Sequence, residues 1–255
     1  MTKRSLAGTI ILAALCLQSP VQVAAQSKPI RVLVSNGMKA AIEELKPQCE
    51  RAINAPLEFQ FSSTAGLKKR IEAGEAFDAT IISAEAIADL IKQGKLAGAS
   101  RADIGRSPLG IGIRAGSAKP NIQTTDALKQ ALVAVPSITY PQDGATRGFI
   151  ERTFDRLGIA QQIKSKIILA PSSGAATESV AMGKATFVIT LFSEIVPVHG
   201  VEILGALPGE YQTYVNFTIA ASASSSRGDA IQKLAAFLTG PTAAPILKGK
   251  GLEVR

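Results

Sequence analysis

Short apolar runs rich in β-branched residues alternate along the chain with segments in which apolar residues recur at helical spacing. In the first part of the chain, the pattern predicts strands at Ile30–Ser35, Leu57–Phe61 and Ala79–Ser83. The helices expected after them cover residues 38–52, 67–74 and 85–93. Proline lacks the amide hydrogen that a helix interior needs, so we expect Pro47 to kink the first helix or to end it early. Three strand–helix units in a row imply parallel strands with right-handed crossovers.

The second part of the chain continues this alternation without a repeat of fixed period. Strands are expected at residues 109–114, 137–140, 166–170, 185–191, 201–204 and 211–221. Helices are expected at residues 124–132, 145–157, 175–182, 227–238 and 241–248. This order predicts an α/β protein of two doubly wound lobes, with residues 26–107 and 216–255 in lobe 1 and residues 108–215 in lobe 2. The hinge would have two crossovers, near Arg106–Pro108 and Gln212–Val215.

The first 25 residues have the pattern of a secretory signal peptide. Lys3 and Arg4 precede the apolar run Leu6–Leu17, which is too short to span a bilayer comfortably, and the small residues Val23–Ala25 follow it. We expect cleavage after Ala25 and a periplasmic mature protein. An uncleaved anchor and a lipoprotein are less favoured alternatives, because a proline follows the run and a bulky residue precedes the first cysteine.

Composition restricts the chemistry that the chain can perform. Its 255 residues are 46% hydrophobic and 19% charged, which is typical of a globular protein and excludes disorder, collagen and coiled coil. One histidine and two cysteines cannot build a zinc finger, a multi-cysteine cluster or a disulfide framework, and we expect neither a metal nor a cofactor. Cys49 falls on the apolar side of the first predicted helix and is expected to be buried and inert.

The formal net charge of +8 indicates an anionic partner. The longest basic run is Lys68–Arg70, and no basic block is interleaved with aromatic residues. An exported protein also has little access to nucleic acid. Among nucleic acid, an anionic membrane and a small anion, the small anion therefore fits best.

Four turns that lead from a predicted strand into a helix share small and hydroxylic residues: Ser35–Met38, Ser62–Gly66, Asp143–Arg147 and Pro171–Ala175. Open α/β sheets bind ligands outside the carboxyl ends of their strands, where helix N-termini offer free amide groups and a favourable dipole. Any one turn is better explained as an ordinary helix cap. Four turns at corresponding ends of two lobes favour an anion site. The candidate ligand-binding residues are Ser35, Asn36, Gly37, Ser63, Thr64, Thr146, Arg147 and Ser173.

With these turns placed, the chain resembles the periplasmic molybdate-binding proteins of ABC importers over nearly all of residues 29–255. The resemblance is most visible in Phe61–Ser83, Gly94–Leu96 and Leu238–Pro241. It implies the type II periplasmic binding fold, a monomer that delivers its ligand to a membrane permease, and a tetrahedral oxyanion held by hydroxyls and amides. It also implies a serine in the first turn and a tyrosine at the end of a later strand, where this chain has Gly37 and Leu191.

The chain also resembles, in outline, aconitate isomerases, which are exported enzymes on the same scaffold. This resemblance rests on Ser35–Pro47, Ser137–Phe149 and Leu191–Pro208. It implies an enzyme that moves a proton along a small tricarboxylate. The candidates for its base are Asp143, Glu194 and His199. The chain has no G-x-S-x-G turn, phosphate-binding loop or dinucleotide loop, so other enzyme classes lack support.

Arg147 distinguishes two kinds of ligand. A guanidinium at the start of a helix in the cleft would bind a carboxylate through two parallel hydrogen bonds, which a metal oxyanion does not need. The alternative is an exposed arginine near Glu151. We therefore predict a solute-binding protein that captures a molybdate-like oxyanion or a small organic carboxylate, with a tricarboxylate isomerase as the alternative.

Overall fold

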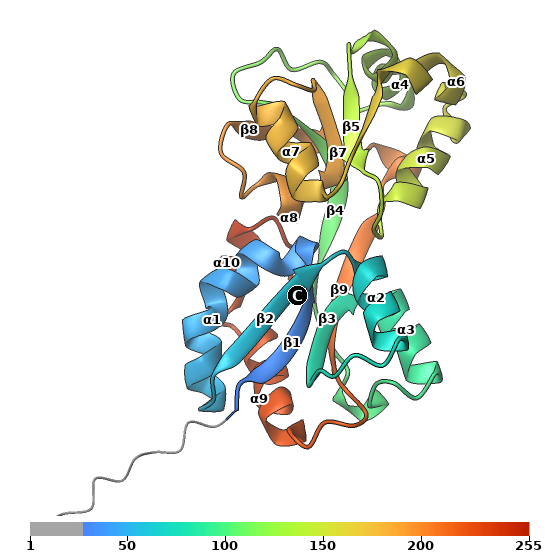
Figure 1. The fold of residues 1–255 in the computed structure, drawn as a ribbon. Coiled ribbons are helices and arrows are strands. Elements are labelled where there is room, and N and C mark those ends of the chain that lie inside the picture. The colour runs from blue at the N-terminus through green and yellow to red at the C-terminus, as the bar shows by residue number, and fades with distance from the viewer. Residues whose placement is uncertain (1–27, 255) are drawn as a thin grey trace, which may run out of the picture.

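The protein is described by a computed structural model that covers residues 28–254, and the expected signal peptide lies outside them. Two α/β lobes are stacked along the long axis of the molecule. Strands β4 (Ala102–Arg114) and β9 (Tyr214–Ala221) run between them, as Figure 1 shows. Within residues 28–254, no helix is long and apolar enough to cross a membrane.

Lobe 1 is built on a sheet with the strand order β2-β1-β3-β9-β4. Its first three strands are β1 (Ile30–Ser35), β2 (Leu57–Ser62) and β3 (Ala79–Ser83). They are parallel, as the alternation of strands and helices predicts, and β9 is antiparallel to both β3 and β4. The helices are α1 (Lys39–Ile53), α2 (Thr64–Glu72), α3 (Ala84–Lys92), α9 (Gly228–Leu238) and α10 (Ala244–Gly249).

Helices cover both faces of the lobe 1 sheet because the buried strands are apolar on both sides. Val32 and Val34 pack into a core with α1, α9 and α10. Leu33, which points to the opposite face, packs with Leu67 of α2 and Ile87 of α3. This arrangement leaves the carboxyl ends of β1 and β2 uncovered by helices and facing lobe 2.

Lobe 2 repeats the architecture with the strand order β8-β4-β7-β5-β6. Its further strands are β5 (Ile138–Pro141), β6 (Ile167–Ala170), β7 (Phe187–Leu191) and β8 (Val201–Ala206). Helices α4 (Thr125–Ala134), α5 (Arg147–Arg156) and α6 (Ala160–Ile163) share one core with the sheet. Helices α7 (Ser173–Ala181) and α8 (Phe192–Ile195) pack on the other face. Both lobes are thus doubly wound, as predicted.

Helix α1 runs through Pro47, and the expectation that this proline would end the helix early is wrong. Pro47 is exposed, so the carbonyl group of Glu43 that loses its helical partner is also on an exposed residue and can bond to water. The buried stripe that includes Ile42 and Leu45 continues to Cys49 and keeps the helix on the sheet. Cys49 is buried, as predicted, and burial raises the pKa of its thiol to about 12.

Strand β4 is longer than the predicted strand at residues 109–114, because polar residues hide its first half from the apolar pattern. Residues 102–108 pair with β9 in lobe 1, and residues 109–113 pair with β7 in lobe 2. Ser107 lies between these halves, where its hydroxyl accepts the Ser193 amide at 3.0 Å and donates to the Gly251 carbonyl at 3.2 Å. These bonds tie the start of α8 and the C-terminal segment to the strand that connects the lobes.

Candidate functional site

A cavity lies between the lobes at the carboxyl ends of their parallel strands, and we call it the inner cavity. It encloses about 390 Å³, including the part that opens to solvent. Lobe 1 and strand β9 contribute Ser35, Asn36, Ser63, Thr64, Val215 and Phe217. Lobe 2 contributes Pro141, Asp143, Gly144, Ala145, Thr146, Ser172, Ser173, Leu191 and Glu194. None of these lining residues is a lysine, an arginine or a histidine.

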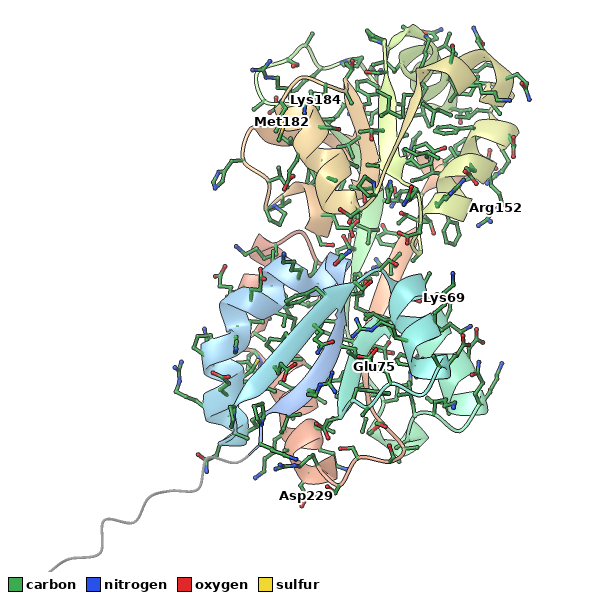
Figure 2. The ribbon with its side chains drawn as sticks, viewed as in Figure 1. Lys69, Glu75, Arg152, Met182, Lys184 and Asp229 are labelled. Carbon is green, nitrogen blue, oxygen red and sulfur yellow. The ribbon has the colours of Figure 1, made fainter. Side chains whose placement is uncertain are left out.

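The basic residues lie elsewhere. Figure 2 labels Lys69 on α2 and Arg152 on α5, which are exposed on the outer surfaces of lobe 1 and lobe 2, and Lys184 beyond α7. The positive net charge therefore belongs to the surface, where it can attract anions at a distance. Hydrogen bonds, rather than ion pairs, must hold a ligand inside the cavity.

On the lobe 1 side, two buried hydroxyl groups meet at the inner cavity. Ser35 ends β1 and Thr64 begins α2, and they are close because β1 and β2 run parallel with Ser35 beside Ser62. Thr64 Oγ1 donates to Ser35 Oγ over 3.2 Å. The hydrogen of Ser35 has no acceptor within residues 28–254 and is free to bind a ligand. The first amide groups of α2 also lack helical acceptors, as at any helix start.

Two more polar side chains of the lining make no hydrogen bond to another described residue. Asn36 stands in the short 3₁₀ turn Asn36–Met38 that joins β1 to α1. Thr146 precedes α5 in lobe 2 and is only 4% exposed. A polar side chain that lines a cavity without a protein partner can bond to a ligand there. Donors from both lobes are thus available to one ligand.

Ser63 and Ser172 have ordinary capping roles. Ser63 Oγ accepts the Gly66 amide at 3.0 Å, and Ser172 Oγ accepts the Ala175 amide at 3.2 Å. Ser63 also connects the lobes, because its hydroxyl lies 3.5 Å from a carboxylate oxygen of Asp143 in lobe 2. The two lobes therefore meet beside the cavity.

Glu194 is the acidic group inside the cavity wall. Its Oε1 accepts a 2.6 Å hydrogen bond from the hydroxyl of Ser173, and its Oε2 accepts one from Thr190. Burial raises the pKa of the Glu194 carboxyl above its ordinary value, and the hydrogen bonds from Ser173 and Thr190 counteract this in part. Glu194 is thus an acid beside the inner cavity whose protonated form is favoured by burial.

A second hollow adjoins the first and shares four residues with it: Asn36, Ser172, Ser173 and Glu194. We call it the outer cavity. It is larger, at about 920 Å³, and more open, and its charged lining residues besides Glu194 are Lys39, Glu43 and Glu178. Within residues 28–254, no group of three or more histidine, cysteine, aspartate or glutamate side chains could hold a metal ion.

The structure brings six of the eight predicted ligand-binding residues to the inner cavity: Ser35, Asn36, Ser63, Thr64, Thr146 and Ser173. Gly37 does not line it, because this glycine is buried under Phe217. A Cβ atom at Gly37 would lie 2.4 Å from the ring of Phe217 and 3.3 Å from Leu191. The serine implied by the resemblance cannot fit here without moving that ring.

Arg147 does not line either cavity. Its guanidinium is held by Glu151 at 2.9 Å and by the carbonyl of Gln142, and its side chain is 39% exposed. This geometry matches the alternative of an exposed helix arginine. Of the three candidate bases, Asp143 lines the inner cavity and Glu194 lines both, whereas the exposed His199 lines neither.

Two contributing residues were missed from the sequence. Thr190 holds Glu194 in place from strand β7 without lining the cavity, and the apolar pattern of that strand gave no sign of this role. Phe217 lines the cavity from β9 and fills the space beside Gly37. No pattern in the sequence joins residues so far apart.

Comparisons with known proteins place the chain among proteins that bind solutes. The family of bacterial extracellular solute-binding proteins matches residues 30–253. An aconitate isomerase from a Pseudomonas species is 29% identical over 252 residues, covering 96% of this chain and 95% of that enzyme.

Two solved structures share the fold. The periplasmic molybdate-binding protein of Azotobacter vinelandii has a TM-score of 0.73 at 19% identity, over 89% of this chain and 99% of that one. The sulfate-binding protein SubI of Mycobacterium tuberculosis has a TM-score of 0.68 at 17% identity, over 89% and 86%. These likenesses confirm the predicted type II periplasmic binding fold. Since the family match spans almost all of the described residues, the chain belongs to the bacterial extracellular solute-binding proteins.

Proposed function

We propose that the protein captures a small anion between its lobes in the periplasm and delivers it, as a monomer, to the permease of an ABC importer. The observation that carries this proposal is the inner cavity, where unengaged donors from both lobes converge and no cationic side chain is present. A small oxyanion or carboxylate accepts several hydrogen bonds at once and suits such a lining. The proposed binding residues are Ser35, Asn36, Ser63, Thr64, Thr146 and Ser173.

Hinge closure gives this capture its mechanism. A ligand that bonds to Ser35 in lobe 1 and Thr146 in lobe 2 has more partners in the closed state than in an open one. The difference in affinity between the two states shifts the equilibrium toward closure. The contact between Ser63 and Asp143 marks where the lobes meet. A permease that recognises both lobes together can then distinguish the loaded protein.

A thermal-shift panel tests the proposal. Molybdate, tungstate, sulfate, phosphate, citrate and the aconitate isomers are compared with chloride at matched ionic strength. A ligand at one hundred times its Kd adds about 2.7 kcal/mol to the free energy of unfolding. For a protein of this size, that raises Tm by about 5–10 °C. If no anion raises Tm even at millimolar concentration, the proposal is wrong.

A tricarboxylate isomerase is the second candidate, and Glu194 is the observation that favours it. A proton-transfer enzyme needs an acid or base at the substrate, and Glu194 lines the cavity with a pKa raised by burial. Incubation with cis-aconitate and with trans-aconitate, followed by chromatography, measures the reaction. Turnover that Glu194→Gln abolishes and Glu85→Gln retains would support the enzyme, because Glu85 is an exposed residue of α3. Absence of turnover removes this candidate.

A further inference from the structure

The inner cavity combines anion-binding geometry with two carboxyl groups, Asp143 and Glu194, and no cation in its lining. A bound dianion and two ionised carboxylates in one small cavity repel one another, and the repulsion is stronger where little water screens it. Anion capture therefore requires a way to remove negative charge from the cavity. A proton is the smallest species that does so.

The two carboxyl groups differ in their surroundings. Asp143 is exposed at the rim, where water solvates its charge. Glu194 is partly buried, and its two oxygens lie against the hydroxyls of Ser173 and Thr190, which are 5% and 0% exposed. Within residues 28–254, Glu194 forms no ion pair with a lysine or an arginine. A proton on Glu194 therefore relieves more electrostatic repulsion in the cavity than a proton on Asp143 would.

The hydrogen bond between Ser173 and Glu194 suggests how such a proton acts on the ligand. Ser173 gives its hydroxyl hydrogen to Oε1 of Glu194 at 2.6 Å, so only its lone pairs remain for the cavity, and lone pairs repel an anion. A protonated Glu194 becomes the donor in the same contact. Ser173 Oγ then accepts, and its own hydrogen turns to the ligand.

We propose that anion capture takes up one proton at Glu194, which releases the Ser173 hydroxyl to bind the anion. This inference rests on the proposed function and adds a specificity-determining residue to it. The covalent change is a proton transfer: an O–H bond forms at a carboxyl oxygen of Glu194, and the bond that held the proton to hydronium or to a buffer acid breaks. Thr190 acts as a positioning residue, because its bond to Oε2 holds the acid toward Ser173.

The outer cavity gives the proton a route, since Glu194 lines both hollows. Four charged side chains share a cavity with Glu194: Asp143 in the inner one, and Lys39, Glu43 and Glu178 in the outer one. Lys39 lies 3.9 Å from Glu43, so the single cation of this group is near another acid. The charged residues of β4 and β8, which pack against α8, line neither cavity.

The proposal predicts a sign for the pH dependence. Burial raises the pKa of Glu194, which brings its protonation closer to neutral pH. Below that pKa the proton is already present, and affinity for a fully ionised anion is highest. Above it, capture must take up the proton, and affinity falls by about tenfold for each pH unit. Sulfate is a suitable probe because it remains a dianion over this range.

The test is isothermal titration calorimetry with sulfate and molybdate, in two buffers that differ in ionisation enthalpy, between pH 6 and pH 8. The difference in binding enthalpy between the two buffers, divided by the difference in their ionisation enthalpies, gives the number of protons taken up for each anion bound. The wild type should take up protons at pH values above the pKa of Glu194 in the free protein, and the count should rise toward one as pH increases. Glu194→Gln should take up none and bind with an affinity independent of pH, whereas the matched control Glu85→Gln should behave as the wild type.

Each outcome decides the question. Binding without proton uptake, at an affinity that pH does not change, overturns the inference and leaves the proposed function intact. If no anion of the panel binds, the proposed function fails and the inference with it. If only aconitate or citrate binds, the protons are counted with that ligand above pH 7. If Glu194→Gln does not fold, a wild-type count of zero at every pH still overturns the inference.

Discussion

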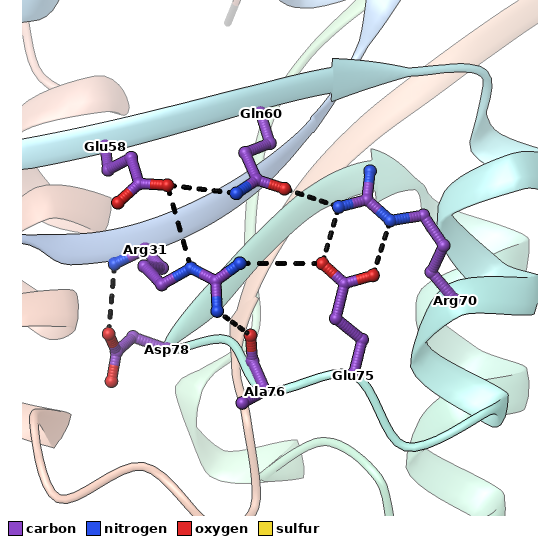
Figure 3. A network of polar contacts seen from close by, with 7 residues as sticks. All are labelled: Arg31, Glu58, Gln60, Arg70, Glu75, Ala76 and Asp78. Carbon is purple, nitrogen blue, oxygen red and sulfur yellow. Dashed lines mark hydrogen bonds and ion pairs between the residues drawn. The ribbon is translucent and has the colours of Figure 1, made fainter.

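The two ends of helix α2 have opposite chemistry. At its N-terminus, which borders the inner cavity, Ser63 caps the Gly66 amide, whereas the amides of Thr64 and Ala65 have no acceptor among the described residues. At its C-terminus, Arg70 bonds through Nε and Nη2 to both oxygens of Glu75 at 2.5 Å, and Nη2 also bonds to Gln60. Figure 3 shows this network. One helix thus separates a binding end from a structural end.

The structural end pairs nearly all of its charges. Arg31 lies 3.7 Å from Glu75 and 3.8 Å from Glu58, and it donates to the Ala76 carbonyl at 2.9 Å. The Arg31 amide donates to Asp78 at 3.0 Å. These bonds join β1, β2 and the loop before β3. Paired groups stabilise the fold and leave nothing for a ligand, whereas unpaired donors cost stability and permit binding. Substitutions at the two ends should therefore affect different properties.

The largest effect is expected from Ser35→Ala at the binding end. A hydrogen bond to a charged group contributes about 1.5–3 kcal/mol, so its loss should weaken anion binding by about 10-fold to 150-fold. The free energy of unfolding without ligand should fall by about 1 kcal/mol, because the Thr64 hydroxyl loses its acceptor. The matched control is Ser117→Ala, on an exposed loop of lobe 2. Equal anion affinities of Ser35→Ala and Ser117→Ala in calorimetry would show that Ser35 does not bind the anion.

Gly37→Ala tests the packing behind the cavity. The added Cβ would lie 2.4 Å from the Phe217 ring, so the ring must move, which should destabilise the protein by about 1–3 kcal/mol. Denaturant unfolding measures the change. Gly228→Ala is the control, because a Cβ there meets no atom within 4 Å. Equal stabilities of the two variants would show that the Phe217 ring can move at little cost and that position 37 does not require glycine.

Arg70→Gln tests the structural end. It should lower the free energy of unfolding by about 1 kcal/mol or less, because the groups are partly exposed, and leave anion affinity unchanged. Arg70 lowers the pKa of Glu75, so the stabilisation is present above the ordinary Glu pKa of 4.5 and disappears as pH falls below the lowered value. Lys69→Gln, at an exposed neighbour, is the control. A difference in the free energy of unfolding between the wild type and Arg70→Gln that persists at low pH would show that it does not come from the ion pair with Glu75.

The smallest effect is expected from Arg147→Ala. A carboxylate bound by Arg147 would be lost on this substitution, but the guanidinium is bound to Glu151 and to the Gln142 carbonyl, as in the alternative given by the sequence. Affinity for citrate or aconitate should therefore change by less than about twofold. A tenfold loss in calorimetry would instead mean that Arg147 turns into the cleft when ligand binds.

The order of elements and the double winding could be predicted from the sequence, because strands buried on both faces and amphipathic helices have distinct periods. The first half of β4 was missed, since residues such as Asp103 and Arg106 break its apolar pattern. Helix α1 passed through Pro47 because tertiary packing outweighs the loss of one hydrogen bond.

The candidate site was predicted in part for a similar reason. Turns before helices are local features, so Ser35, Thr64 and Thr146 could be named from the sequence. The partner of each side chain is not local. Nothing in the sequence indicates that Ser173 gives its hydrogen to Glu194, or that Phe217 occupies the space beside a glycine. Such pairings follow from the register of strands that are distant along the chain.

An anion bound between the lobes should contact the free donors of both lobes. Amide-detected NMR measures this with the anion that gives the largest thermal shift. The amide signals of residues 64–65 in lobe 1 and of residues 144–146 and 173–174 in lobe 2 should shift together and fit one saturation curve. Shifts confined to one lobe, or centred on the outer surface around Lys69 and Arg152, would rule out binding between the lobes.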